Sequence, residues 1–150
     1  MDLILWRHAD AQDGMPDMDR ALTDRGRKQA EKMGAWLAGK LPEDALILAS
    51  PALRAQQTVA ALGRRYKTVK SIAPGADAVY VLTAAGWPNA KGTVLVVGHQ
   101  PTLGLAASLV LCGKESDFSI KKGALLWLTS RVRGEQQQVL LKAALTPELL

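Results

Sequence analysis

The sequence contains little sulfur, few aromatic side chains and no long apolar run. Its single cysteine, Cys112, excludes an internal disulfide framework and fits a reducing compartment. With one phenylalanine, two tyrosines and no interleaving of aromatic and basic residues, it lacks a stacking platform for nucleic acid. The longest weakly polar run, residues 103–113, is well short of the roughly 18–20 residues that span a bilayer. The start at Met1 does not resemble a signal peptide, so we expect a cytoplasmic protein that binds neither membrane nor nucleic acid.

The chain also lacks the patterns of common cofactor and metal sites. It has no glycine-rich nucleotide loop of the Walker or Rossmann type. Ser50 is followed by proline and lacks the flanking glycines of a nucleophile elbow. The two histidines and the one cysteine lie in unrelated segments without metal-ligand spacing. We therefore predict neither a cofactor nor a metal.

Positive charge is in excess. Nineteen Lys and Arg residues against fourteen Asp and Glu give a formal charge of +5. The cations gather at residues 25–28, 64–67 and 121–122. Such clusters form either a solvated surface or a region that attracts an anionic substrate or an acidic partner. The sequence leaves these alternatives open, with nucleic acid the least favoured partner because aromatic residues are few.

Apolar runs alternate with segments of helical period, which is typical of an α/β sheet. The apolar runs predict strands at residues 3–6, 45–49, 68–73, 93–97, 123–129 and 137–141. Capping and turn residues predict helices that begin at Thr23, Ser50-Pro51, Asp77 and Pro101. The tail after Pro147 is expected to be loose.

No linker or change in composition divides the chain. We therefore expect one domain over residues 1–150, which is long enough to bury a substantial core. The order of elements predicts an α/β fold with three layers: a central, mostly parallel sheet, helices on both faces, and one antiparallel strand.

Both histidines of the chain closely follow predicted buried strands. His8 is separated by one residue from the run at 3–6, and His99 by one residue from the run at 93–97. In open α/β sheets, groups at the carboxyl ends of strands line the crevice where ligands bind. One sheet could therefore bring these two imidazoles face to face. Imidazole is well suited to nucleophilic and proton chemistry near neutral pH.

Two arginines accompany the histidines. Arg7 is adjacent to His8, and Arg54 lies near the start of the helix opened by Ser50-Pro51. A guanidinium matches phosphate oxygens bidentately, and a helix N-terminus adds backbone donors for the same anion. This set predicts a phosphate pocket in which one neutral imidazole attacks phosphorus while the other groups hold its oxygens. The cationic surroundings are expected to lower the pKa of the nucleophile, so that it stays neutral at cellular pH.

Four segments together resemble the histidine phosphatase superfamily. They are Leu5–Ala9, Ala21–Gly26, Ser50–Thr58 and Val97–Pro101, in matching order and spacing. Within the superfamily, the short chain and these motifs are most similar to the SixA-type phosphohistidine phosphatases. The resemblance covers roughly residues 3–105 and implies a phosphoglycerate-mutase-like three-layer sandwich.

The resemblance also implies a role for individual side chains. His8 would be the nucleophile that accepts the phosphoryl group, and His99 the second histidine that stabilises the group during transfer. Arg7 and Arg54 would bind the phosphoryl oxygens. Arg20, just before the second segment, would either line the pocket mouth or anchor its loop, and both alternatives stay open.

Two positions depart from the superfamily pattern. Ala9 stands where glycine is usual, and its methyl group is small, although it could narrow the approach of the backbone to phosphate. The general acid that phosphomonoesterase and mutase members use has no clear equivalent. Asp77 and Asp10 are the candidates for it.

The uncertain acid favours an N–P bond in the substrate. An alkoxide that leaves a phosphate ester is strongly basic and needs a positioned acid, whereas phosphohistidine can be protonated on its free ring nitrogen near neutral pH. We therefore expect a phosphatase that acts on a phosphohistidine-bearing signalling protein, either a phosphotransfer domain or a phosphocarrier. The alternatives are a small-molecule phosphomonoesterase on the same scaffold and a non-catalytic module that binds a phosphorylated ligand.

Overall fold

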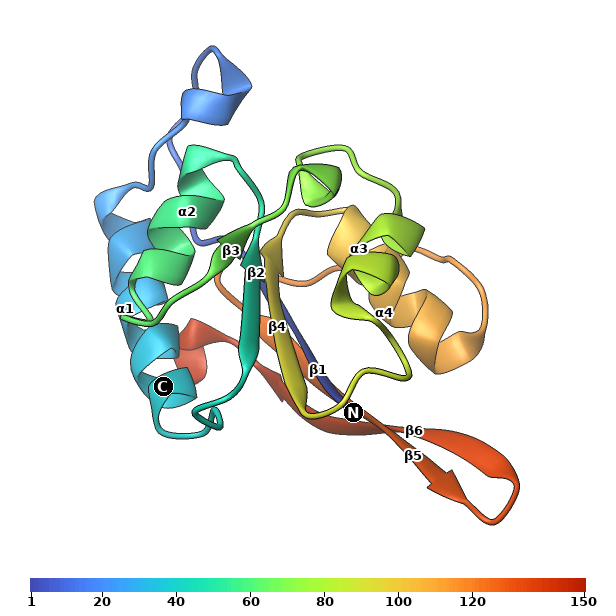
Figure 1. Ribbon diagram of the computed structural model, residues 1–150. Coiled ribbons are helices and arrows are strands. Elements are labelled where there is room, and N and C mark those ends of the chain that lie inside the picture. The colour runs from blue at the N-terminus through green and yellow to red at the C-terminus, as the bar shows by residue number, and fades with distance from the viewer.

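The computed structural model describes every residue from Met1 to Leu150 and contains one six-stranded sheet between two layers of helices (Figure 1). The strands are β1 (Asp2–Arg7), β2 (Leu46–Ala49), β3 (Lys67–Thr68), β4 (Thr93–Gly98), β5 (Leu125–Arg133) and β6 (Gln136–Leu145). They lie in the order β3-β2-β4-β1-β5-β6. The α-helices are α1 (Asp24–Ala38), α2 (Leu53–Ala60), α3 (Ala78–Ala85) and α4 (Thr102–Cys112). Three short 3-10 helices are η1 (Asp17–Asp19), η2 (Lys70–Ile72) and η3 (Pro147–Leu149).

The predicted three-layer α/β architecture is confirmed. Strands β1 to β4 are parallel, and β5 alone runs against both of its neighbours, β1 and β6. Alternate side chains of β1 enter two separate cores. Ile4 and Trp6 pack with α1 and α2 on one face, while Leu3 and Leu5 pack with α3 and α4 on the other. All four side chains are fully buried, as expected for a central strand covered on both faces.

The register of β1 and β4 determines where the two histidines lie. These central strands pair in parallel with Arg7 opposite Gly98. The next residue in each chain segment is a histidine, and His8 N–H donates to Gly98 O at 3.0 Å. His8 and His99 therefore leave the sheet together at its carboxyl edge, which is where open α/β sheets bind ligands.

Helix α1 begins where the sequence predicts. Thr23 Oγ1 accepts the Gly26 N–H at 3.0 Å and caps the helix N-terminus. Gly26 has a packing role, because a Cβ at this position would collide with the Asp10 carbonyl group. The absence of a side chain at Gly26 thus lets the loop that follows β1 lie directly on α1.

Besides the two strands of the β5–β6 hairpin, three predicted elements are wrong in extent. The strand expected at 68–73 shortens to the two residues of β3, because the chain turns into η2 and buries Ile72 in the core that contains α3. Helix α2 begins at Leu53, later than predicted, because the Ser50 hydroxyl faces His99 and accepts only the Ala52 N–H. The tail is not loose throughout, since Pro147 is buried and η3 packs beside α1.

The β5–β6 hairpin is longer than the sequence predicts and extends beyond the amino end of β1 (Figure 1). Its turn lies at the opposite end of the sheet from the histidines. None of the helices combines the length and the apolar character needed to cross a membrane.

Candidate active site

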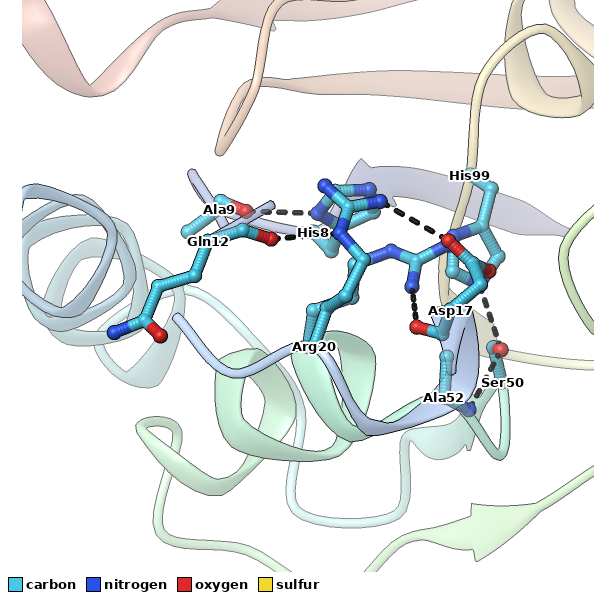
Figure 2. Close-up of polar contacts among 9 residues, drawn as sticks. His8, Ala9, Gln12, Asp17, Arg20, Ser50, Ala52 and His99 are labelled. Carbon is cyan, nitrogen blue, oxygen red and sulfur yellow. Dashed lines mark hydrogen bonds and ion pairs between the residues drawn. The ribbon is translucent and has the colours of Figure 1, made fainter. Parts of the chain in front are cut away.

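His8 and His99 lie against each other at the carboxyl edge of the sheet. Their ring centroids are 5.1 Å apart and their planes are inclined by 52°. Both residues are buried, with 6% and 3% of their surfaces exposed. Figure 2 shows the two imidazoles with the polar groups that hold them. The sheet therefore brings together the two histidines that the sequence analysis selected.

The hydrogen bonding of His8 leaves one ring nitrogen with a free lone pair. Nδ1 lies 2.7 Å from the Ala9 carbonyl oxygen. A carbonyl oxygen can only accept, so Nδ1 carries the proton and Nε2 does not. Burial lowers the pKa of His8 from 6.5 to about 4, although its hydrogen bond to Ala9 opposes the shift. The neighbouring arginines lower this pKa further, so the ring is neutral at pH 7.

His99 is held by Ser50. Its Nε2 lies 2.7 Å from Ser50 Oγ, which also accepts the Ala52 N–H at 3.2 Å. Burial lowers the pKa of His99 to about 3, and the positive charge that His8 can acquire contributes further. Sequence reasoning missed this hydrogen bond, because the residue pattern identifies Ser50 only as a helix start. The contact depends on β2 and β4 being neighbours in the sheet.

Arg54 is positioned by its own helix and by the loop after His8. Thr58 Oγ1 donates to Arg54 O at 2.7 Å and accepts the Ala9 N–H at 3.0 Å. This hydroxyl ties α2 to the residue that follows His8. The Arg54 side chain is 5% exposed, so its guanidinium lies buried where α2 meets the site.

Three buried side-chain nitrogens in the protein have no hydrogen-bond partner: Arg7 Nε, Arg54 Nε and His99 Nδ1. All three belong to the residues predicted to hold a phosphoryl group. An unpaired buried donor costs about 1–3 kcal/mol, so such groups are rare unless they serve a ligand. Arg7 NH1 donates to the Ile120 carbonyl at 2.9 Å, which fixes the guanidinium and leaves Nε unpaired.

Asp17 is a further site residue, which sequence reasoning missed. Arg54 donates from NH1 to Asp17 O at 2.8 Å and from NH2 to Asp17 Oδ2 at 3.2 Å. Arg20 NH1 donates to Asp17 Oδ1 at 3.1 Å (Figure 2). The carboxylate thus joins two arginines at the mouth of the site. No sequence signal separates Asp17 from the other aspartates of the same polar loop.

Arg20 anchors the loop that follows β1, which is one of the two alternatives that the sequence left open. Its Nε donates to the Gln12 carbonyl at 2.6 Å, and this bond anchors the loop. Its charge also helps to lower the pKa of His8. Arg20 therefore holds the loop and adds positive charge to the site.

The alanine at the usual glycine position is part of the packing between the loop and α1. Ala9 is fully buried, and its methyl group packs in a small cluster with Leu22 and Ala30. Its N–H and C=O are both engaged, with Thr58 and His8 respectively. The methyl group fills the space between the loop and α1.

Neither candidate general acid is arranged as a proton donor. Asp10 accepts from Lys122 Nζ at 2.9 Å and from Thr23 Oγ1 at 2.7 Å, and these hydrogen bonds hold its pKa below the usual range. Asp10 is therefore an ionised carboxylate in a structural role. Asp77 is exposed and forms no hydrogen bond or ion pair with the site. No group of three or more His, Cys, Asp and Glu side chains is close enough to hold a metal.

The arrangement defines a class of site. A neutral buried imidazole with a free Nε2 lies beside a second imidazole, the buried guanidinium of Arg54 and the half-buried guanidinium of Arg7. Such a set can bind the oxygens of a phosphoryl group and accept the phosphorus covalently. The fold and the site together are therefore suited to bind a phosphoryl group beside two imidazoles.

Comparison with known proteins identifies the family. Residues 3–75 match the family model of the histidine phosphatase superfamily, branch 1. Phosphohistidine phosphatase SixA of Escherichia coli K12 is 31% identical over 138 residues, which cover 86% of this chain and 85% of that protein. An uncharacterized protein of Mycobacterium tuberculosis H37Rv is 34% identical over 121 residues, or 76% of this chain and 75% of that protein. The chain belongs to the histidine phosphatase superfamily, which confirms the resemblance predicted from the motifs.

Solved structures agree with this assignment. The structure of the protein histidine phosphatase SixA complexed with tungstate matches with a TM-score of 0.78 and 26% identity, over 99% of both chains. A SixA structure from Agrobacterium tumefaciens matches with a TM-score of 0.80 over 97% of both chains. At 24% identity, the second match demonstrates the shared fold alone. Membership of the superfamily supports a phosphatase activity.

Proposed function

We propose that this protein is a metal-independent phosphohistidine phosphatase that works through a covalent phosphohistidine on His8. The observation that carries the proposal is the set of unpaired buried donors on Arg7, Arg54 and His99, beside an imidazole whose Nε2 lone pair is free. The donors match the negative oxygens of a phosphoryl group, and the lone pair matches its phosphorus.

In the first step, His8 Nε2 attacks phosphorus, so that the new N–P bond forms as the bond to the leaving group breaks. Negative charge spreads over the phosphoryl oxygens, where Arg7 and Arg54 stabilise it. Water then attacks the phosphorus of phospho-His8 and releases inorganic phosphate, which returns the neutral imidazole. The Nδ1–H of His8 remains bonded to the Ala9 carbonyl and supports the positive ring of the intermediate.

Ser50 determines which nitrogen of His99 carries a proton. Ser50 Oγ accepts the Ala52 N–H, and its own proton has no acceptor other than His99 Nε2, so the hydroxyl donates to this nitrogen. The ring proton then lies on His99 Nδ1, the nitrogen without a partner. His99 is in this way a neutral donor for a phosphoryl oxygen.

The absence of a poised acid favours phosphohistidine over a phosphate ester. The carboxylates of Asp10 and Asp17 are hydrogen-bonded to cations, which lowers the pKa of both groups. A leaving imidazole can take its proton from solvent before the bond breaks, whereas a leaving alkoxide cannot. The similar protein from E. coli is named a phosphohistidine phosphatase, and a similar SixA structure is complexed with tungstate, an oxyanion of phosphate-like shape. We propose as substrate a phosphotransfer or phosphocarrier protein of the cytoplasm.

The test is phosphate release, in the presence of a chelator, from a phosphohistidine peptide and from an alkyl ester, glycerol phosphate, whose leaving group is a strongly basic alkoxide. We expect faster release from the peptide, and a loss of at least about 10³-fold in His8→Ala. His8→Asn is a matched control for folding, because Asn retains a donor for the Ala9 carbonyl. Brief reaction with labelled peptide should leave acid-labile phosphate on the wild-type protein and none on either variant.

Three outcomes would contradict the proposal. Preference for the ester would instead indicate a small-molecule phosphomonoesterase. Peptide binding without any phosphate release would indicate a non-catalytic module. Full activity of His8→Ala would exclude His8 as the nucleophile.

A further inference from the structure

Two of the three basic clusters of the sequence converge beside the proposed active site. Arg25 of α1 lies with Lys121 and Lys122, which precede β5, around a cleft of about 300 Å³. Arg7 also lines this cleft, and no apolar side chain does. The cleft therefore shares a guanidinium with the group of residues that we propose to bind phosphate.

The cleft is attached directly to the segment that carries the nucleophile. Gly123, which follows the two lysines, donates its N–H to His8 O at 3.0 Å. Lys122 Nζ donates to Asp10 Oδ1 at 2.9 Å, two residues after His8. A ligand in the cleft would thus lie at a fixed position relative to His8.

A smaller hollow of about 180 Å³ extends the basic surface along α1. It shares Arg25 and Glu148 with the cleft and adds Lys28 and Lys32. The combined lining comprises six cations (Arg7, Arg25, Lys28, Lys32, Lys121 and Lys122) and two carboxylates (Asp10 and Glu148). Its net charge of +4 is most of the +5 carried by the whole chain.

We propose that this basic cleft binds carboxylate side chains that flank the phosphohistidine on the substrate polypeptide. The inference rests on the proposed function and specifies its substrate as an acidic surface. Complementary charge at a rim steers a partner and sets its orientation, which would present the phosphohistidine to His8. An acidic polypeptide fits better than nucleic acid, because the lining offers no aromatic side chain for base stacking and carries two carboxylates.

The kinetic test uses two phosphohistidine peptides of equal length, one flanked by glutamates and the other by glutamines. For the wild type we expect kcat/KM to be about tenfold higher for the glutamate peptide at low salt, and the preference to fade at about 0.5 M NaCl. The double variant Arg25→Gln with Lys121→Gln should bring this ratio close to one. Because the ratio is taken within one protein, a partial loss of folded enzyme cancels.

The matched control is Arg131→Gln with Arg133→Gln, which removes the same charge from the exposed end of β5, at the opposite end of the sheet. This control should keep the wild-type ratio. Glu148→Gln should raise the ratio by about twofold, since it removes a carboxylate from the cleft. A similar drop in both double variants would mean that net charge alone attracts the peptide, and would overturn the proposal.

A binding measurement separates this inference from the proposed function. His8→Ala protein should bind the unphosphorylated glutamate peptide more tightly than the glutamine peptide, by fluorescence anisotropy, and the Arg25 and Lys121 substitutions should remove the difference. Equal binding of the two peptides would overturn the proposal that the cleft binds carboxylates, even if the wild type releases phosphate. Failure to release phosphate with selective binding intact would contradict the proposed function alone. Tighter binding of a single-stranded oligonucleotide than of the glutamate peptide would also overturn the proposal.

Discussion

The two ends of strand β1 differ in whether their buried polar groups have hydrogen-bond partners. At the amino end, the Asp2 carboxylate accepts from Trp127 Nε1 at 2.8 Å, Thr129 Oγ1 at 3.0 Å and Lys142 Nζ at 3.1 Å. Burial acts against ionisation of Asp2, but these hydrogen bonds outweigh it and lower the pKa. At the carboxyl end, five residues after Asp2, the strand ends on Arg7, whose buried Nε is unpaired.

This difference suggests that the amino end of the strand contributes mainly to stability and the carboxyl end mainly to function. Satisfied buried groups stabilise the fold, whereas unsatisfied donors lower its stability and become useful only when a ligand meets them. We therefore expect substitutions at the amino end to change the free energy of unfolding. Those at the carboxyl end should change turnover, and removing an unpaired donor there should cost little stability.

The largest expected effect is on turnover, in Arg54→Lys. A lysine keeps the charge but loses the planar fork that holds two phosphoryl oxygens. We expect phosphate release to fall by about 10²–10³-fold, and the melting temperature to fall by less than a core substitution causes, because a lysine can keep only part of the hydrogen bonding to Asp17. Steady-state kinetics and thermal unfolding of the same preparation check both parts. A fall in melting temperature as large as that caused by a core substitution would contradict the expectation that the carboxyl end of β1 serves turnover more than stability.

The second effect is a loss of stability in acid that arises from the carboxyl end. The pKa values of about 4 for His8 and about 3 for His99 lie below the ordinary 6.5, so the unfolded chain takes up protons that the native protein excludes. The contribution of each neutral histidine to the free energy of unfolding is fully present above pH 6.5. It decreases as the pH drops, and at pH 4 about 3 kcal/mol per histidine is lost.

Denaturant unfolding between pH 7 and pH 4 measures this loss of unfolding free energy. The variant His8→Gln should lose less stability over the same pH range, because it has one histidine fewer. Nitrogen-15 NMR resolves the two rings individually, because the chain has only two histidines. It should show a neutral His8 with its proton on Nδ1 at pH 6. A midpoint near 6.5 for either ring would contradict the prediction.

The third effect is a loss of stability without a loss of turnover, at the amino end of β1. Asp2→Ala leaves Trp127 Nε1 and the Thr129 hydroxyl without their acceptor. We expect a destabilisation of about 2 kcal/mol in denaturant unfolding, with kcat unchanged. Asp2→Asn is the conservative control, since its amide oxygen can still accept from one of these donors. A large loss of turnover in folded Asp2→Ala would show that the two ends are coupled.

The smallest effect is expected at Asp17. Its carboxylate accepts from Arg54 and Arg20, the cations that a phosphoryl group would also attract. Asp17→Asn should therefore tighten tungstate binding by about threefold, because a neutral amide competes less for these arginines. Isothermal titration calorimetry measures the change, with Asp19→Asn as a control in the same loop. Weaker binding would mean that Asp17 orients Arg54 instead of competing with the ligand.

The fold was largely predictable because its signals are local. The apolar runs of β1 and β4, the Thr23 cap and the helical spacing in α1 are properties of neighbouring residues, and each element formed near its predicted place. The edge strand β3 was not predictable in extent. Its length depends on the burial of Ile72 against α3, a contact that no local pattern encodes.

The sequence by itself determined which side chains stand at the ends of the central strands. A strand fixes the direction of the residue that follows it, so a histidine after each parallel strand must appear at the same sheet edge. Arg7, His8 and His99 could be placed at this edge for this reason, whereas Arg54 was selected from its helix start and from the motif that contains it.

Only the tertiary structure decided the state of those side chains. The Ala9 carbonyl selects the tautomer of His8, Ser50 holds His99, and Asp17 joins the arginines, through contacts that depend on the folded loop and on strand order. The convergence of Arg25 with Lys121 and Lys122 depends likewise on where α1 and the segment before β5 meet. Hydrogen bonding, burial and electrostatic potential are sums over neighbours in space, and folding chooses those neighbours from distant parts of the chain.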